Sequence, residues 1–153
     1  MLQKNVFKLS AVALISIVLA ACASSTSSVT GTVSSKEGTV RELVRNVGDR
    51  VFFETDSSRL SASARNTISK QAEWLNTNSV NLLIEGHADE RGTRDYNLAL
   101  GARRANAVRD FMVSLGVDPS RLSTVSYGKE RPVSLCADES CWSKNRRSVS
   151  AVR

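Results

Sequence analysis

The chain has 153 residues, and its 21 Lys and Arg against 15 Asp and Glu give a formal net charge of +6. This length predicts one folded domain, and 41% hydrophobic with 24% charged residues excludes a disordered or collagen-like chain. The positive charge brings nucleic acid and anionic membranes into consideration as partners, and the three cysteines leave an odd one to explain.

The first 21 residues have the pattern of an export signal. Lys4 and Lys8 precede an uncharged apolar run over residues 9–20. As a helix this run would rise about 18 Å, which is too short for a bilayer core of about 30 Å. Its length and its basic flank are typical of a signal peptide.

The small residues before Cys22 predict that this cysteine is a membrane anchor. Leu19-Ala20-Ala21-Cys22 resembles a bacterial lipobox, in which the cysteine is acylated and becomes the new N-terminus after cleavage. An ordinary signal peptide with an incidental cysteine is the alternative. Several acyl chains anchor a protein stably. Because Ala23 and not an aspartate follows, resemblance to sorted lipoproteins favours the outer membrane.

A segment rich in Ser and Thr follows the predicted anchor. Nine of the twelve residues 24–35 are Ser or Thr, and none is charged. Such a stretch buries too little apolar surface to offset its ordering entropy. We therefore predict a lipidated and flexible tether over residues 22–48 and a folded domain over residues 49–153, with a weak indication of an ordered lead-in at Val40, Leu43, Val44 and Val47.

Strands and helices alternate through the predicted domain. The patterns predict strands at 50–54, 80–85, 124–127 and 147–152, a helix capped by Ser61 and reaching about residue 76, a helix over 96–115, and a short helix capped by Asp138. The expected buried face of the second helix comprises Leu98, Ala105, Val108, Met112 and Leu115. This alternation predicts an α/β layer sandwich, with the helices packed on one mixed sheet.

Three polar residues are expected to converge at the end of the second strand. Asp89 lies in the loop after that strand, and Asn97 and Arg104 lie seven residues apart, nearly on one face of the following helix. A carboxylate beside a guanidinium suits a zwitterionic ligand, with Asp89 binding an ammonium and Arg104 a carboxylate. From spacing alone an internal Asp89–Arg104 salt bridge is the more common arrangement, and both interpretations stay open.

The same segment carries a family resemblance. Residues 86–101, GHADERGTRDYNLALG, resemble the OmpA C-terminal domain family, a peptidoglycan-binding module, and within it the peptidoglycan-associated lipoprotein branch. Residues 126–132 (SYGKERP), 138–140 (DES) and Trp142 before 145–147 (NRR) agree. The resemblance extends from about Val51 to Val152 and implies the OmpA-like βαβαβ(α)β sandwich.

The resemblance implies a ligand and assigns residues to it. The family's ligand is the diaminopimelate side chain of the peptidoglycan stem, whose free end carries an amine and a carboxylate. The family's motif places the ammonium-binding aspartate at Asp89 and the carboxylate-binding arginine at Arg104. The other residues that it implies at or near the pocket are Asn97, Asp56 and Arg147. Relatives often read Phe-Asp-x-Asp where this chain has Phe53-Glu54-Thr55-Asp56.

His87 is the only histidine, and it invites a metal or catalytic interpretation. One histidine and one neighbouring Asp provide too few ligands for zinc, and Cys136 and Cys141 add no further histidine. No nucleophile lies at motif spacing. We therefore expect no metal, no cofactor and no enzymatic activity, and we place His87 at the edge of the pocket.

Cys136 and Cys141 are separated by four residues. In an exported domain such a pair can close a small disulfide ring, because the compartment is oxidising. Two unpaired buried thiols are the alternative.

The abundance of arginine does not predict nucleic-acid binding. Arginine outnumbers lysine 15 to 6, but aromatic residues make up only 5% of the chain and few lie beside the basic segment. Binding to single strands would need stacking aromatics and access to nucleic acid, which an exported lipoprotein lacks.

The combined expectation is a non-enzymatic outer-membrane lipoprotein that faces the periplasm and ties the membrane to peptidoglycan. By resemblance it would also act with the Tol system, especially TolB, in envelope integrity and cell division. The alternatives are an OmpA-like wall-binding lipoprotein independent of Tol, and a wall hydrolase or amidase, for which paired catalytic groups are not visible.

Overall fold

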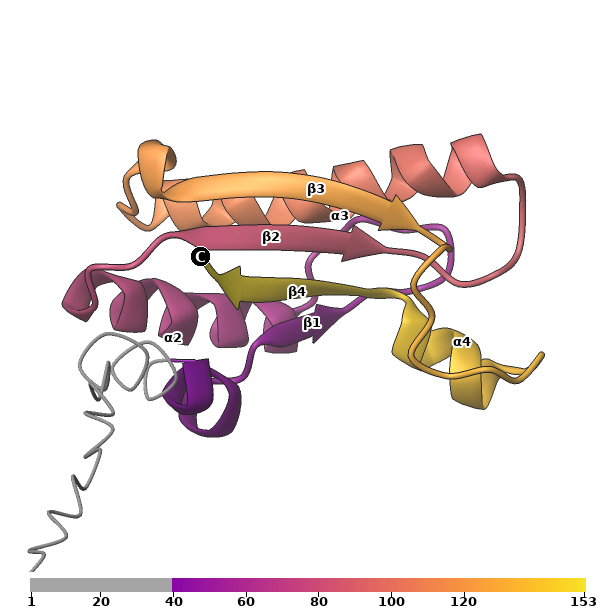
Figure 1. Ribbon diagram of the computed structural model, residues 1–153, viewed down its shortest axis with the longest axis horizontal. Helices are drawn as coiled ribbons and strands as arrows, with labels where there is room; N and C mark the ends of the chain where they lie inside the picture. Colours follow the sequence, from indigo (N-terminus) through magenta and orange to yellow (C-terminus); the bar gives the residue numbers. More distant parts are fainter. Residues whose placement is uncertain (1–39) are drawn as a thin grey trace, which may run out of the picture.

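The structure, a computed structural model, describes residues 40–153 (Figure 1). The predicted signal peptide over 1–21, the lipidation site Cys22 and the tether up to residue 39 lie outside the described residues. Within residues 40–153, no helix is both long and apolar enough to cross a bilayer.

Three helices begin where a polar side chain accepts a backbone hydrogen bond. Helix α2 spans Ala62–Thr77, α3 spans Arg94–Ser114 and α4 spans Glu139–Asn145. The caps are Ser61, Thr93 and Asp138, which accept from the N–H of Ala64, Tyr96 and Ser140 respectively. The predicted caps Ser61 and Asp138 are confirmed. Helix α3 begins two residues before the predicted start because Thr93 caps it.

Four strands form one mixed sheet. Strands β1 (Arg50–Phe52), β2 (Leu82–His87), β3 (Leu122–Gly128) and β4 (Arg147–Val152) lie in the order β1-β4-β2-β3. Strand β2 is parallel to β3 and antiparallel to β4, and β4 is antiparallel to β1. Figure 1 shows α2 and α3 packed behind this sheet, with its other face open to the viewer. The predicted sandwich with helices on one mixed sheet is confirmed.

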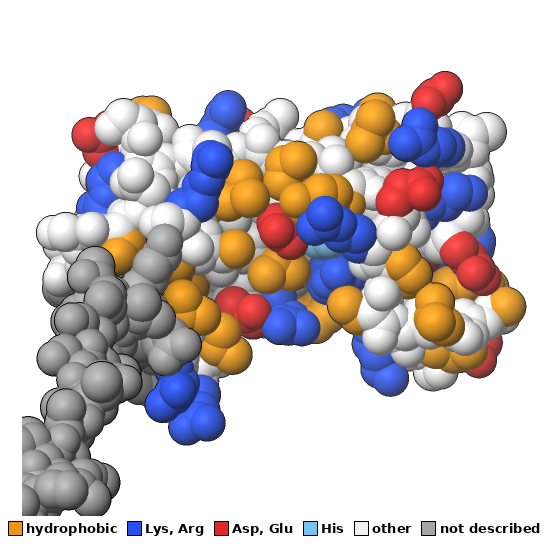
Figure 2. Space-filling model, viewed as in Figure 1, with side chains coloured by type: hydrophobic (Ala, Val, Ile, Leu, Met, Phe, Trp, Pro, Cys, Tyr) orange, Lys and Arg blue, Asp and Glu red, His pale blue; other side chains and the backbone are white. Residues whose placement is uncertain are grey.

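The core lies between the sheet and the two long helices. Ile68, Leu75, Leu82, Ile84 and Met112 are fully buried there. The open face of the sheet, seen in Figure 2, instead mixes apolar side chains with basic and acidic ones.

The predicted buried face of the second helix was partly wrong. Leu98 and Leu115 are 43% and 40% exposed. Asn97 and Arg104 are instead buried on α3. The prediction followed the apolar residues, but the side of α3 that faces the sheet carries polar residues at its N-terminal half.

Helix α3 lies unusually close to β2 at a pair of glycines. A Cβ atom on Gly86 would stand 1.8 Å from the backbone oxygen of Gly101, and one on Gly101 would stand 2.3 Å from the Ser126 Oγ. Such distances leave no room for any side chain. The two glycines therefore set the depth at which α3 sits on the sheet.

The packed unit begins before residue 49, where the sequence placed the start of the domain. A helical turn, η1 (Leu43–Val47), buries Leu43 to 1% exposure in the core. Gln71 of α2 donates to the Gly48 carbonyl at 2.6 Å. The lead-in is thus attached to α2.

The structure joins Cys136 and Cys141 by a disulfide, with the Cα atoms 5.5 Å apart. The bridge closes the loop between β3 and α4 and is anchored at the buried Cys141.

Gly86→Ala is expected to lower the free energy of unfolding by about 3 kcal/mol or more, because the added methyl meets backbone that cannot yield without moving α3. Urea denaturation measures this. Ala99→Ser, on the exposed face of the same helix, is the control and should change stability by less than about 0.5 kcal/mol. Equal stability of the two variants would contradict the close approach.

Thiol labelling of the purified mature domain should fail without reductant and reach two thiols after reduction and unfolding. Stoichiometric labelling of Cys136 and Cys141 in the untreated native protein would show that the pair is not bridged.

Candidate functional site

A cavity of about 300 Å³ opens at the carboxyl end of β2. It lies between the loop after β1, the loop after β2 and the first half of α3. The lining residues are Thr55, Asp56, Asp89, Arg91, Gly92, Tyr96, Asn97, Leu100 and Arg104. Four of the six residues that the sequence assigned to ligand binding therefore come together.

Arg104 is completely buried at this cavity. Its Nε donates to the Ser57 carbonyl at 2.8 Å, Nη1 to the His87 carbonyl at 2.8 Å and Nη2 to the Glu54 carbonyl at 3.1 Å. The guanidinium carbon also lies 5.1 Å from the centre of the Phe53 ring. Burial lowers the pKa of Arg104 to about 10, so the group stays charged at neutral pH.

The Asp89–Arg104 salt bridge is not formed. Arg104 makes no ion pair within the described part of the chain, and Asp89 pairs with Arg91 and Arg146. A guanidinium has five N–H groups, and Arg104 uses three of them on carbonyls. Two N–H groups of this charged side chain therefore make no hydrogen bond among the described residues.

Asp89 is only 7% exposed and is surrounded by donors. Its Oδ2 lies 2.6 Å from Arg91 Nη2 and 3.4 Å from Arg146 Nη1. Burial alone would raise the pKa of Asp89, but the hydrogen bonds from the side chain and backbone of Arg91 and from Arg146 outweigh it and hold the pKa below its usual value. Asp89 is therefore a carboxylate at neutral pH.

Asn97 and Asp56 complete the walls of the cavity. Asn97 is buried, and its Nδ2 donates to the Arg91 carbonyl at 2.7 Å, which fixes the loop that carries Asp89. Asp56 adopts a positive φ of 54°, and its carboxylate accepts a hydrogen bond from the Tyr96 hydroxyl. This contact links the loop after β1 to α3 at the cavity.

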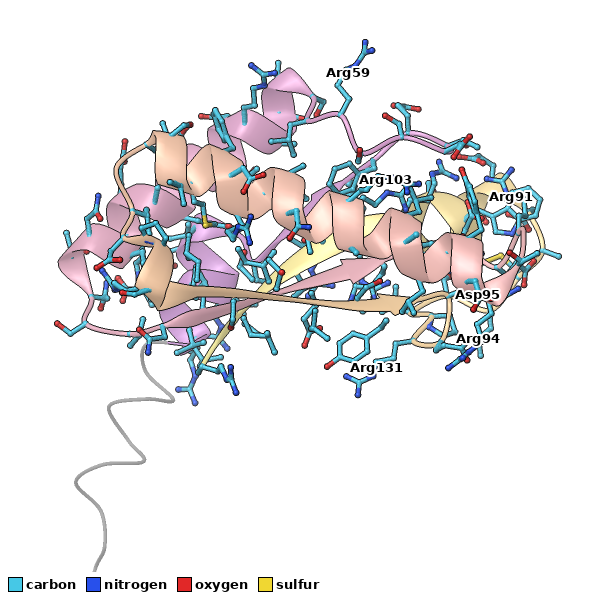
Figure 3. All side chains as sticks on the ribbon, turned by 90° about the horizontal axis from the view of Figure 1, so that it is seen from above. Arg59, Arg91, Arg94, Asp95, Arg103 and Arg131 are labelled. Carbon is cyan, nitrogen blue, oxygen red and sulfur yellow. A yellow bond between two sulfur atoms is a disulfide. The ribbon has the colours of Figure 1, made fainter. Side chains whose placement is uncertain are left out.

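His87 contributes its backbone, and not its ring, to the cavity. Its carbonyl holds Arg104, while the ring lies 5.5 Å from the Tyr127 ring and does not line the cavity. Among the described residues neither ring nitrogen makes a hydrogen bond, although Nε2 lies 3.4 Å from a carboxylate oxygen of Glu85. Burial, followed by the charges of Arg147 and Arg131, lowers the pKa of His87 to about 4, so the ring is neutral at pH 7. Figure 3 shows Arg131 on the open side of the sheet, away from Arg91 at the start of α3.

Arg147 does not line the cavity, whereas its neighbour Arg146 reaches Asp89. Arg147 donates to the carbonyls of Asn145 and Arg131 at 3.3 and 3.1 Å. Arg146 is 4% exposed and donates to the Phe53 carbonyl at 3.0 Å. Two consecutive arginines between α4 and β4 point to opposite sides, and nothing in the sequence indicates which one faces the site.

Two further residues of the site went unnoticed in the sequence. Arg91 and Tyr96 both line the cavity and both lie inside the 86–101 motif. Only their position between Asp89 and Asn97 in the motif could have indicated a role in the site. Exposed Arg and Tyr residues at the start of a helix are too common for their residue type to indicate one. Within residues 40–153, the cavity included, no three His, Cys, Asp or Glu side chains come together as metal ligands.

The model of the OmpA family matches residues 52–146. The chain belongs to the OmpA family. It is 57% identical over 123 residues to the peptidoglycan-associated lipoprotein of Mesorhizobium japonicum, over 80% of this chain and 73% of that one. The protein of the same name from Pseudomonas aeruginosa is 50% identical over 96 residues, which cover 63% and 57% of the two chains.

Solved structures agree with this family membership. The crystal structure of the peptidoglycan-associated lipoprotein from Burkholderia pseudomallei superimposes with a TM-score of 0.69 at 36% identity, over 72% of this chain and 99% of that one. The C-terminal domain of Helicobacter pylori MotB reaches 0.64 at 24% identity, over 69% and 84%, and shows the shared fold alone. The two relatives and the Burkholderia protein are named as lipoproteins and none as an enzyme, which agrees with the expectation of a non-catalytic protein.

His87 predicts an acid-sensitive fold. Because its folded pKa is about 4 and its unfolded value about 6.5, the unfolded chain binds one more proton between these pH values, and stability falls as pH falls through this window. Between pH 7 and pH 5 we expect the free energy of unfolding, measured by urea denaturation, to fall by about 1–2 kcal/mol. His87→Gln should flatten this dependence; an unchanged slope would contradict a neutral buried ring. Asp89 and Glu139, with lowered pKa values, titrate at lower pH.

Proposed function

We propose that this chain is an envelope lipoprotein that binds peptidoglycan non-covalently through the cavity at the start of α3. The observation that carries this proposal is the buried Arg104 guanidinium, which makes no ion pair within residues 40–153 and has two N–H groups without a hydrogen bond there, in a cavity that Asp89 also lines. A buried charge is costly unless it is paired and hydrogen-bonded, and a ligand carboxylate would supply the opposite charge. The names of the relatives support peptidoglycan as that ligand.

The ligand group that suits the cavity is the zwitterionic end of diaminopimelate in the peptide stem. Its carboxylate would accept hydrogen bonds from Arg104, and its ammonium would pair with Asp89. Asn97 would hold the loop that carries Asp89, and Asp56 with Tyr96 would border the entrance. His87 would act through its carbonyl on Arg104, and Arg147 would support the loop at Arg131 from the far side of the sheet.

We further propose that Cys22 carries the lipid, that the domain faces the periplasm, and that the outer membrane is the anchored one. The packed turn at 40–47 leaves residues 23–39 between anchor and domain. Fully extended, these 17 residues would reach about 60 Å. The connection would tie the membrane to the cell wall without a covalent bond to the wall.

The resemblance also supports action within the Tol system, with TolB as the partner. The alternative is a wall-binding lipoprotein that acts without Tol. Incubation of the purified domain with purified TolB, followed by size-exclusion chromatography, separates the two: a complex is expected, and no complex at micromolar concentration would favour the alternative.

Peptidoglycan pull-down tests the proposed site. Asp89→Ala and Arg104→Ala should each weaken binding about tenfold to a hundredfold, because each removes hydrogen bonds to a charged group of the ligand. Asp95→Ala and Arg103→Ala are the matched controls. Both residues are exposed on α3, and both variants should bind as the wild type does.

Arg104 also holds the loop after β1 to the end of β2, so thermal unfolding must show that its variant is folded. Arg104→Lys retains the charge and provides a second variant should Arg104→Ala fail to fold. Normal binding by folded variants at both positions would overturn the proposed site. Cleaved products after incubation with muropeptides would overturn the binding function in favour of a hydrolase.

A further inference from the structure

The carboxylate of Asp89 is saturated with donors before any ligand arrives. Its Oδ1 accepts from the backbone N–H and from Nε of Arg91, both at 3.2 Å. Its Oδ2 accepts from Arg91 Nη2 at 2.6 Å and from Arg146 Nη1 at 3.4 Å. A carboxylate offers about four acceptor positions. An ammonium group can therefore reach Asp89 only if one of these donors leaves.

Of these donors, only the side chain of Arg91 is placed to leave. The side chain of Arg146 is 5% exposed and is also held by Phe53 and Glu139. The backbone of Arg91 is held by Asn97. The side chain of Arg91, by contrast, is 39% exposed.

The remaining contacts of the Arg91 guanidinium lie outside the carboxylate. They are a 3.4 Å contact with Thr55 Oγ1 and a position 4.1 Å from the Trp142 ring centre. The Trp142 ring is held in turn by a 3.0 Å hydrogen bond from its Nε1 to Glu90. The guanidinium can therefore leave Asp89 and still keep a cation–π contact.

We propose that the Arg91 guanidinium occupies, in the ligand-free protein, the position on Asp89 that the ligand ammonium takes, and that the ligand displaces it. This inference rests on the proposed function. Arg91 is then an internal competitor, which lowers the net contribution of the ammonium to binding.

A two-by-two comparison isolates this competition. The probes are the soluble tripeptide L-alanyl-γ-D-glutamyl-meso-diaminopimelate and the same tripeptide with its distal amine acetylated. The proteins are the mature chain as wild type and as Arg91→Ala, with Arg94→Ala as control, since Arg94 is exposed and pairs only with Glu130 among the described residues. Dissociation constants are measured by calorimetry at pH 7.5.

We expect Arg91→Ala to bind the free-amine probe about tenfold more tightly than the wild type and the acetylated probe with little change. Arg91→Lys, which retains charge without the paired donors, should lie between the two, and Arg94→Ala should match the wild type. An equal loss of affinity for both probes in Arg91→Ala would show that Arg91 contacts the ligand, and it would overturn the inference. The inference would also fail if the ratio of the two probes' dissociation constants were the same in Arg91→Ala as in the wild type.

Binding of the free-amine probe by the wild type and by Asp89→Ala tests the proposed function independently of Arg91. If the wild type binds neither probe and Asp89→Ala changes nothing, the proposed function fails, and this inference fails with it. If the wild type binds the free-amine probe and Asp89→Ala abolishes that binding, the proposed function stands whatever Arg91→Ala does.

Discussion

The structure depends on the burial of one guanidinium that makes no ion pair within residues 40–153. Arg104 cross-links Glu54 and Ser57, in the loop after β1, to His87 at the end of β2. Three backbone carbonyls replace water around the cation and fix the walls of the cavity at the same time. Since a fully paired arginine would be more easily buried, a ligand carboxylate bound to Arg104 would also stabilise the fold. The residue that organises the loops is also the residue that a ligand carboxylate would meet.

The glycine pair Gly86 and Gly101 makes that geometry possible. With no side chain at either position, α3 rests directly on β2. Arg104 lies one helical turn after Gly101, so the same close approach brings its guanidinium within 2.8 Å of the His87 carbonyl, one residue after Gly86. The helix thus lies deep enough for the buried side chain of Arg104 to reach both the end of β2 and the loop after β1.

The sequence predicted the fold and part of the site, and the differences have physical causes. Alternating strands and helices were readable from periodicity, and helical geometry alone placed Asn97 and Arg104 on one face. Periodicity misassigned Leu98 and Leu115, because polar residues occupy part of the buried face of α3. The choice between Arg146 and Arg147 depends on the direction in which the chain leaves α4, and the donors around Asp89 depend on how the loop after β2 folds back. Both are tertiary properties without a local pattern.

The packed turn at Leu43 determines how a pull between membrane and wall would pass through the domain. The chain enters at η1, and Figure 1 shows β1 running from there toward the end of the sheet where α3 begins and the cavity lies. A load applied between the two ends would act along β1 and therefore perpendicular to its hydrogen bonds with the antiparallel neighbour β4. These bonds would be sheared together and not opened one after another. The edge strand β1 would then resist the load through all of these bonds at once, and the buried Leu43 would be the first packed side chain on the path of the load.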